Sequence, residues 1–152
     1  RPMGRNASGV RGVRLKDSND EVVGMLSVND MDSDILVVSE NGYGKRSKLD
    51  DYRITNRGGK GVKTISITEK TGSLVSIKNV ADGDDLMIIN KSGIAIRMEV
   101  NSLRVMGRAT QGVRLINLKD NDSIAAVAKV VLDDEDVQDI DDIEVVDDNQ
   151  IN

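Results

Sequence analysis

Three families of segments in this chain repeat at intervals of about 51 residues, and this periodicity constrains the possible fold more than any other feature. Members of the first family place an Arg four residues before a Gly that is followed by Val and a cation: GRNASGVRGVRL (4–15), NRGGKGVKTISI (56–67) and GRATQGVRLINL (107–118). The second pairs DILVVSENGYGKRS (34–47) with DLMIINKSGIAIRM (85–98), and the third joins the segments that begin at Val22, Leu74 and Ile124. Because three families agree on one period, we predict a repeat architecture.

Each repeat unit has the pattern of short β-strands joined by tight turns. The runs DILVVS and DLMIIN are rich in branched apolar residues, and each precedes a glycine-bearing turn and a second run. In IAIRMEV, the alternation of Ile94, Ile96, Met98 and Val100 with other residues predicts that these four face the core and that Arg97 faces away. The equivalent run YGKRSKL is less regular, because a lysine, Lys45, occupies the position of Ile96.

We therefore predict an all-β fold, a β-pinwheel or propeller-like repeat of roughly four-stranded blades, with about three blades in residues 1–132. Box-like loops are expected near residues 5–9, 57–61 and 108–112. A closed ring usually needs more blades, so we expect this chain to be a fragment of a longer one. With 1% aromatic residues, its core has to be built from Val, Ile, Leu and Met.

The composition excludes several classes of function. The chain has no cysteine, so it forms no disulfide or thiolate metal site, and no histidine, the commonest general base. A nucleotide-binding P-loop is excluded because Ile54 stands where Gly is required and Gly61 where Ser or Thr is required. The paired aspartates that begin at 50, 84 and 133 are expected in turns or in the tail. We predict no catalytic centre, cofactor or metal in this chain.

The net charge of −5 hides a strong segregation of charge along the chain. Residues 133–152 hold ten of the 26 acidic residues and no basic one, so residues 1–132 carry 21 cations against 16 acids. We predict a basic domain at 1–132 and an acidic, disordered tail at 133–152. A basic body is typical of a polyanion binder, and such a tail can either compete for the basic surface or simply keep the protein soluble.

Cations recur at equivalent places of the repeat, which predicts a basic band along one curved rim. The candidate DNA-binding residues are Arg5, Arg57 and Arg108 at the first position, Arg11, Lys63 and Arg114 at the second, Arg46 and Arg97 at the third, and Lys60 in the central glycine loop. A curved basic band suits bent duplex DNA, with contacts to phosphates that give affinity but little sequence discrimination. The scarcity of aromatic residues argues against single-stranded nucleic acid.

The same residues resemble a known family, the C-terminal domain of the bacterial DNA gyrase A subunit. The box of that family is QRRGGKG, and TNRGGKG at 55–61 matches it at Arg57, Gly58, Gly59, Lys60 and Gly61. The segments RPMGRNASGVRGVRL, ENGYGKRSKLDDY and VMGRATQGVRLI are similar to its later blades, so the resemblance covers nearly all of residues 1–132. It implies a six-bladed β-pinwheel with DNA wrapped around its edge.

The resemblance also implies the setting in which this chain works. The parent would be a cytoplasmic, nucleoid-associated bacterial topoisomerase that introduces negative supercoils, and the partners would be the remaining domains of the gyrase A subunit, with the gyrase B subunit, in an A2B2 complex. Its catalytic tyrosine, ATP and Mg²⁺ would lie on other domains, and Tyr43 is better interpreted as a packing residue after a turn. We expect no membrane association, since no apolar run approaches the roughly 20 residues that a span needs.

Two alternatives to this interpretation stay open. The equivalent domain of topoisomerase IV shares the architecture, although GGKG and NGYGK favour gyrase. A protein-binding propeller fits the period, but would normally show aromatic or Gly-Gly strand signatures that this chain lacks. An enzyme is a distant third.

Overall fold

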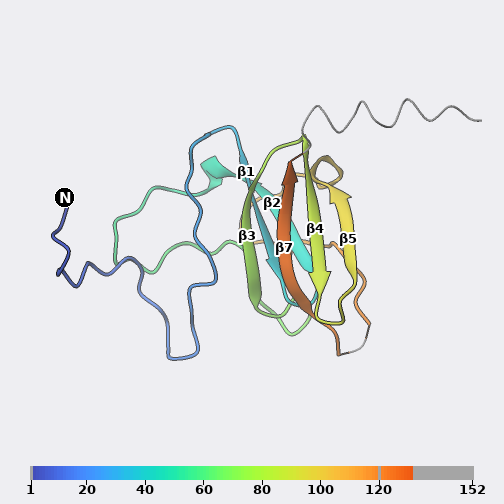
Figure 1. Ribbon diagram of the computed structural model, residues 1–152, viewed down its shortest axis with the longest axis horizontal. Coiled ribbons are helices and arrows are strands. Elements are labelled where there is room, and N and C mark those ends of the chain that lie inside the picture. The colour runs from blue at the N-terminus through green and yellow to red at the C-terminus, as the bar shows by residue number, and fades with distance from the viewer. Residues whose placement is uncertain (1, 120, 132–152) are drawn as a thin grey trace, which may run out of the picture.

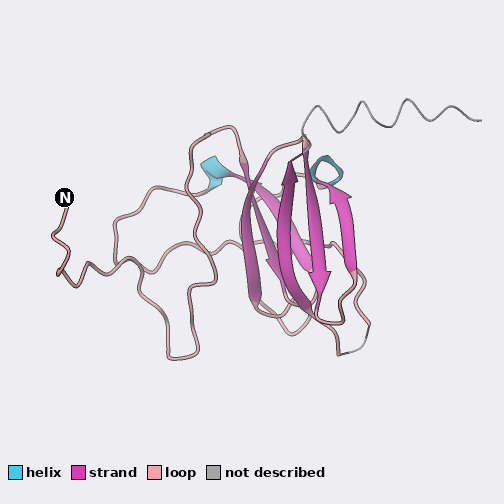
Figure 2. Ribbon diagram, in the orientation of Figure 1, coloured by secondary structure: helices cyan, strands magenta, loops and turns pink. Residues whose placement is uncertain are grey.

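The computed structural model describes residues 2–119 and 121–131, and its regular structure is almost entirely β (Figures 1 and 2). The elements in chain order are β1 (Asp34–Ser39), β2 (Tyr43–Lys48), η1 (Leu49–Asp51), β3 (Leu74–Val80), β4 (Asp84–Asn90), β5 (Ala95–Glu99), η2 (Val100–Ser102), β6 (Val113–Arg114) and β7 (Ile124–Val131). The described part of the chain has no helix suited to crossing a membrane. The all-β prediction is confirmed, and the predicted acidic tail at 133–152 lies outside the described residues.

The strands form two antiparallel sheets that interleave along the sequence. One sheet has the order β3-β1-β2-β6, and the other has the order β5-β4-β7. In each sheet a hairpin, β1-β2 or β4-β5, is joined at its first strand by a strand that starts about 40 residues later in the chain. The sets β1, β2 and β3 (34–80) and β4, β5 and β7 (84–131) each span about one repeat period, and β6 joins the second period to the first sheet.

The two predicted hairpins are confirmed, with their glycines in the turns. In the first, β1 pairs with β2 from Asp34 opposite Lys48 to Val38 opposite Gly44. Gly42 in its turn has a φ of 78°, and a Cβ there would lie 2.8 Å from the carbonyl oxygen of Ile116. Both the backbone angle and the lack of space therefore favour glycine at this position.

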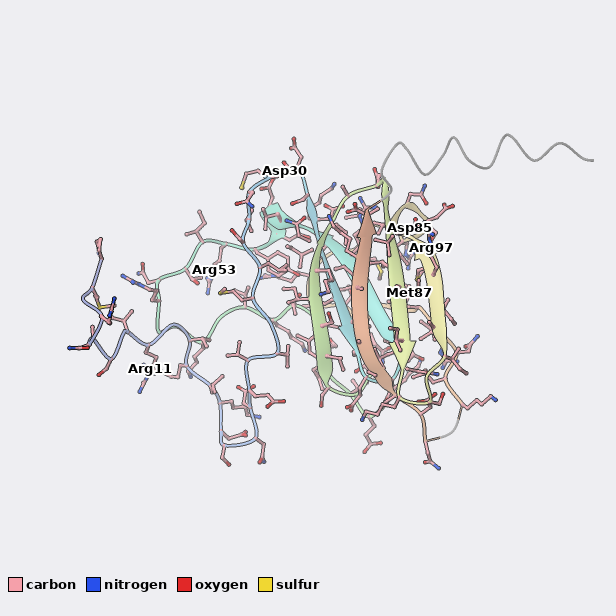
Figure 3. All side chains as sticks on the ribbon, in the orientation of Figure 1. Arg11, Asp30, Arg53, Asp85, Met87 and Arg97 are labelled. Atoms are coloured by element: carbon pink, nitrogen blue, oxygen red, sulfur yellow. The ribbon has the colours of Figure 1, made fainter. Side chains whose placement is uncertain are left out.

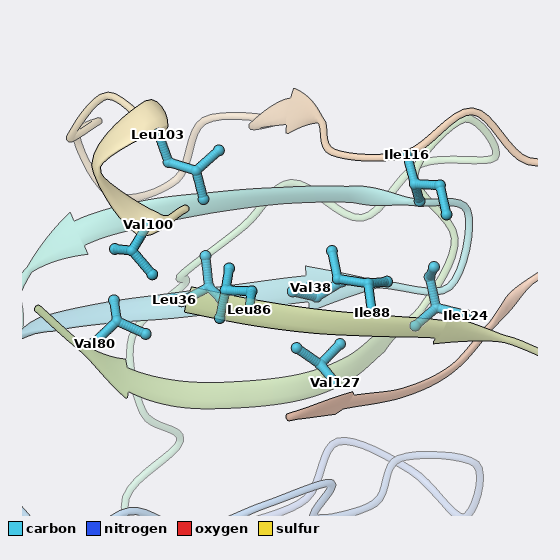
Figure 4. Close-up of a cluster of buried hydrophobic side chains, with 10 residues drawn as sticks. All are labelled: Leu36, Val38, Val80, Leu86, Ile88, Val100, Leu103, Ile116, Ile124 and Val127. Carbon is cyan, nitrogen blue, oxygen red and sulfur yellow. The ribbon is translucent and has the colours of Figure 1, made fainter. Parts of the chain in front are cut away.

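An aliphatic core lies between the two sheets (Figure 4). Its fully or nearly buried residues are Leu36, Val38, Val80, Leu86, Ile88, Val100, Leu103, Ile116, Ile124 and Val127. The opposite face of β1 contributes Ile35 and Val37 to a second cluster with Ile65, so all six residues of β1 are buried. The predicted core of branched and unbranched aliphatic residues is confirmed.

The prediction of about three blades differs from the two sheets observed. Residues 22–28 match β3 and β7 in sequence, but they form no strand, and Met25 is 90% exposed. Among the described residues, no strand or bridge pairs with this segment. A strand sequence without a partner leaves its peptide groups to water.

The predicted alternation in β5 is only partly correct. Val100 is buried and Met98 packs against the core, but Ile94 and Ile96 are exposed. The reason is that β5 is an edge strand, and no strand within the described residues pairs with its outer side in the way that β6 pairs with β2. The lysine that interrupts the pattern in β2, Lys45, is 1% exposed, and its Nζ donates a hydrogen bond to the carbonyl oxygen of Gly107 at 2.7 Å.

Backbone hydrogen bonds tie the box-like loops to one another in sequence order. The amide of Gly58 donates to the carbonyl oxygen of Gly12 at 2.7 Å, and the amide of Arg14 donates to that of Gly59 at 2.8 Å. One repeat later, the loop at 108–112 makes the same kind of contact with residues 64–66. The amide of Ala109 donates to the carbonyl oxygen of Thr64 at 3.2 Å, and the amide of Ser66 donates to that of Thr110 at 3.0 Å. Each loop is thus fastened to the segment that follows the preceding loop.

Each hairpin also carries a diagonal pair of an Arg and an Asp. The Nε of Arg46 lies 2.5 Å from Asp34 Oδ2, and the Nε of Arg97 lies 2.6 Å from Asp85 Oδ2. The first pair is buried: Arg46 is 5% exposed, and its second nitrogen reaches Asp82 at 2.6 Å. Burial acts to lower the pKa of Arg46, but the hydrogen bonds to Asp82 and Asp34 outweigh it, and the pKa of the guanidinium is raised.

Replacement of Arg46 by Met should destabilise the domain strongly, because it leaves the buried carboxylate of Asp34 with only Lys48 near it. We expect a loss of about 3 to 5 kcal/mol in the free energy of unfolding, measured by urea denaturation. Arg97→Met is the matched control, since that guanidinium is half-exposed and should cost about 1 kcal/mol or less. Equal losses in the two variants would contradict a role for burial.

Backbone strain at Ala109 gives a second stability prediction. Ala109 has a φ of 65°, where the equivalent residue of the preceding repeat is Gly58, with a φ of 75°. Ala109→Gly should relieve the left-handed penalty and stabilise the domain by about 1 kcal/mol in thermal or urea unfolding. Gly61→Ala, with a φ of 77° and open space around its Cβ, should cost about 1 to 2 kcal/mol. Opposite signs for the two variants are the required result.

Candidate nucleic-acid interface

The loop at 57–61 presents its two cations to solvent. Arg57 and Lys60 are both exposed, and positive φ angles at Gly58 and Gly61 turn the backbone between them. The hydrogen bonds to residues 12 and 14 hold the loop from behind. A fixed backbone with exposed charged side chains is suited to phosphate contacts, which depend on charge more than on exact side-chain geometry.

The preceding loop carries the equivalent cations. Arg5 and Arg11 are exposed, and they lie in the extended N-terminal part of the chain, away from the two sheets (Figure 3 labels Arg11). Because this segment bonds directly to the loop at 57–61, its cations continue the series of that loop.

The third loop holds Arg108 and Arg114 in contact with other side chains. Arg114 is exposed, and its Nε and a terminal nitrogen donate to the hydroxyl of Tyr43 at 3.3 and 2.9 Å. Lys70 Nζ lies 5.4 Å from the centre of the same ring. The hydrogen bond from Arg114 is the main cause that lowers the pKa of the Tyr43 phenol. Tyr43 is 6% exposed and packs after the turn, as predicted, but it also orients a cation.

Arg108 and Lys63 meet at a pocket of about 390 Å³ that the sequence did not predict. Its lining comprises Asp51, Arg53, Gly61, Val62, Lys63, Arg108 and Ala109. Arg53 was missed, although the repeat contained a signal for it: Arg53 and Arg104 both stand four residues before a first-position Arg. The loop at 108–112 bonds to residues 64–66, which brings Arg108 and Ala109 beside residues 61–63.

The third repeat position requires a correction. Arg46 was predicted on the rim, but it is buried and bound to Asp34 and Asp82, so its guanidinium is not free for a phosphate. Arg97 lies in the β5-β4-β7 sheet beside Asp85, as Figure 3 shows, and the two side chains form an ion pair. Each of the two cations pairs with the aspartate at the equivalent diagonal position of its own hairpin, a structural role that sequence alone does not distinguish from that of a rim cation.

Across residues 2–119 and 121–131, no three carboxylates gather closely enough to hold a metal ion. The exposed cations of the loops offer guanidinium and ammonium groups, which are hydrogen-bond donors to anions.

Comparisons with known families, sequences and structures give consistent results for this chain. The family described as "DNA gyrase C-terminal domain, beta-propeller" matches residues 1–29, 33–81 and 84–130. The DNA gyrase A protein of Staphylococcus aureus (strain NCTC 8325 / PS 47) is 51% identical over 138 residues, which cover 90% of this chain and 15% of that protein. Its counterpart from strain MRSA252 is 51% identical over 132 residues, or 86% of this chain and 15% of that protein.

Solved structures show the same relationship. A DNA gyrase A C-terminal domain superposes with a TM-score of 0.76 at 32% identity, covering 86% of this chain and 44% of that one. The C-terminal domain of a DNA topoisomerase IV has the same TM-score at 22% identity, covering 85% of this chain and 40% of that one, which shows a shared fold. By its sequence match over three successive repeats and its 51% identity to a DNA gyrase A protein, the chain belongs to the DNA gyrase A C-terminal domain family.

Proposed function

We propose that this domain binds duplex DNA and bends it around the rim formed by its successive box-like loops, without a catalytic role of its own. The observation that carries this proposal is the hydrogen bonding of each loop to the segment after the preceding loop. Along the chain the cations follow in the order Arg5 and Arg11, then Arg57, Lys60 and Lys63, then Arg108 and Arg114, and loops bonded in this way would keep that order in space. Successive cations on a continuous rim match successive phosphates on a duplex.

The energy of bending sets a requirement on these contacts. Bending a site of 20 to 30 base pairs by 40° to 90° costs on the order of 1 to 6 kcal/mol. Several phosphate contacts have to offset this cost, and each contact releases condensed counterions from the DNA. Binding by this rim should therefore be strongly salt-dependent and nearly independent of sequence.

Membership of the gyrase family supports a larger proposal for the whole protein. Gyrase is a topoisomerase, and the chain spans about 15% of the length of the gyrase A proteins that it matches. We infer that DNA wrapped by this domain is delivered to a cleavage and ATP-hydrolysis machinery located on other domains and on the gyrase B protein. In this view the domain supplies the handed path of the DNA that makes supercoiling directional.

The equivalent role in topoisomerase IV is the other candidate, and the fold does not separate the two. Both solved C-terminal domains superpose with a TM-score of 0.76. The difference lies in the sequence, which is 32% identical to the gyrase domain and 22% identical to the topoisomerase IV domain. Together with the GGKG loop, this favours the gyrase role.

Removal of the two cations in the central loop tests the proposal. The double variant Arg57→Gln and Lys60→Gln should weaken binding to a duplex of about 35 to 40 base pairs and reduce the slope of log K against log salt by about 1 for each lost contact. Fluorescence anisotropy across a salt series measures both quantities. Lys91→Gln, an exposed cation in the β4–β5 turn, is the control that should leave the slope unchanged.

The result that would contradict the proposal is a slope that the double variant shares with the parent chain. A change that depends on DNA sequence would also contradict it, because phosphate contacts carry no direct sequence information.

The acidic tail gives a separate prediction about regulation of the rim. Its ten acidic residues lie outside the described residues, and they oppose the charge of the body. A chain that ends at Leu132 should bind the same duplex more tightly than the full chain, with the largest difference at low salt. Equal affinities at every salt concentration would leave the tail as a solubilising segment only.

A further inference from the structure

We propose that the pocket between the loops at 57–61 and 108–112 binds a single phosphate group, held by Arg53, Lys63 and Arg108. The pocket has a volume of about 390 Å³, and its charged lining is these three cations and Asp51. It is a place on the rim where cations from three separate segments of the chain converge on one space. Where the phosphate belongs to DNA, the inference rests on the proposed function.

The walls of the pocket are fixed by the contacts between repeats. On one side, Ala109 donates its amide to the carbonyl oxygen of Thr64 at 3.2 Å, and Ser66 Oγ donates to the carbonyl oxygen of Ala109 at 2.9 Å. On the other side, Tyr52, beside Asp51 and Arg53, shares a hydrogen bond of 2.5 Å with the hydroxyl of Thr64. The three segments that carry the cations are therefore held in place before any ligand arrives.

Arg108 is the lining residue whose side chain has a hydrogen-bond donor left unused. The Nε of Arg108 is buried and has no hydrogen-bond partner in the part of the chain that the structure describes. A buried N–H without an acceptor is costly, and in native proteins such a group usually has a partner. Because the Nε itself is shielded, an oxyanion in the pocket would be held by the terminal guanidinium nitrogens of Arg108, which is one of the lining residues.

The charges around the pocket favour an anion over a cation. Burial lowers the pKa of Lys45, with Asp51 opposing the shift and the nearby charge of Arg108 adding to it. Asp51 is the acidic residue in the lining, and its negative charge offsets part of the repulsion between Lys45 and Arg108. A bound anion would relieve this excess of positive charge, whereas a metal ion would increase it.

The chemistry of the lining identifies the anion as a phosphate. Guanidinium groups bind phosphate through paired N–H donors, and an ammonium group adds a point charge. Gly61 and Ala109 have little or no side chain, so no bulky side chain at these positions obstructs the entry of an anion. The lining has no aromatic residue on which a base could stack, which disfavours a nucleotide base as the bound part. A DNA phosphodiester and free inorganic phosphate remain as the two sources.

The test compares these two sources on the full chain. Inorganic phosphate is titrated at constant ionic strength while amide shifts are followed by NMR, and we expect saturable shifts at Gly61, Lys63 and Ala109. Arg108→Gln should weaken phosphate binding about tenfold, the effect of one charge-assisted hydrogen bond. Lys63→Gln, an exposed residue whose loss does not threaten folding, should act in the same direction. Lys91→Gln should bind phosphate as the parent does.

Duplex binding by the same variants decides the source. If Arg108→Gln and Lys63→Gln each weaken binding to the 35 to 40 base pair duplex about tenfold, the pocket holds a DNA phosphate. If phosphate saturates the pocket but the variants bind the duplex as the parent does, the ligand is free phosphate and the DNA source is overturned.

A failure of this inference is distinguishable from a failure of the proposed function. Phosphate shifts that do not saturate, or that Arg108→Gln leaves unchanged, overturn the pocket. The proposed function stands in that case if the Arg57 and Lys60 double variant still flattens the salt dependence of duplex binding. A chain that binds phosphate but no duplex overturns the DNA-binding function and leaves the pocket.

Discussion

The hydrogen bonding of each repeat to the next is the interaction on which the rest of this structure depends. Strand β3 completes the sheet of β1 and β2, and β7 completes that of β4 and β5, although each lies about 40 residues beyond its partner. Each of these three-stranded sets lies within about one repeat period, and β6, which comes from the second period, pairs with β2 and links the two. The same linkage fastens the loops on the rim, so the stability of the sheets and the order of the surface cations have one cause.

The aliphatic core follows from this interleaving and explains why aromatic residues are scarce. Strand β1 is covered on one face by the β5-β4-β7 sheet and on the other by the second cluster, around Ile65. The buried residues between the sheets are Val, Ile and Leu, whose side chains are similar in size and pack densely. Gly44 has no room for a side chain, because a Cβ there would lie 2.5 Å from Leu115 Cδ1 and 2.7 Å from the carbonyl oxygen of Val37.

Much of the fold was predictable from the sequence, because the repeat reveals what local propensity alone leaves uncertain. The hairpins at 34–48 and 84–99 and the all-β class follow from period-two runs and glycine turns. The exposure of Met25 and Ile96 was not predictable, since burial depends on whether a neighbouring edge is present and not on the residue itself. Likewise, a buried Arg46 and an exposed Arg57 look alike in a sequence, and only the diagonal partner Asp34 distinguishes them.

The recurrence of a cation thus has two different physical origins in this chain. On strands, Arg46 and Arg97 recur because each answers an aspartate two residues away across the hairpin. On the loops that the structure describes, the recurring cations form no ion pair with an aspartate, and each loop repeats the same contact with the segment that follows the preceding loop. The pocket is lined by Arg53, which precedes the loop at 57–61, by Lys63, which follows that loop, and by Arg108, which lies in the next loop. One repeat earlier in the sequence, the corresponding positions are those of Arg1, Arg11 and Arg57. There, a Cβ added at Gly58 would lie 3.6 Å from the carbonyl oxygen of Arg11. A junction between loops, and not a single loop, is therefore the repeating functional unit that we infer for this rim.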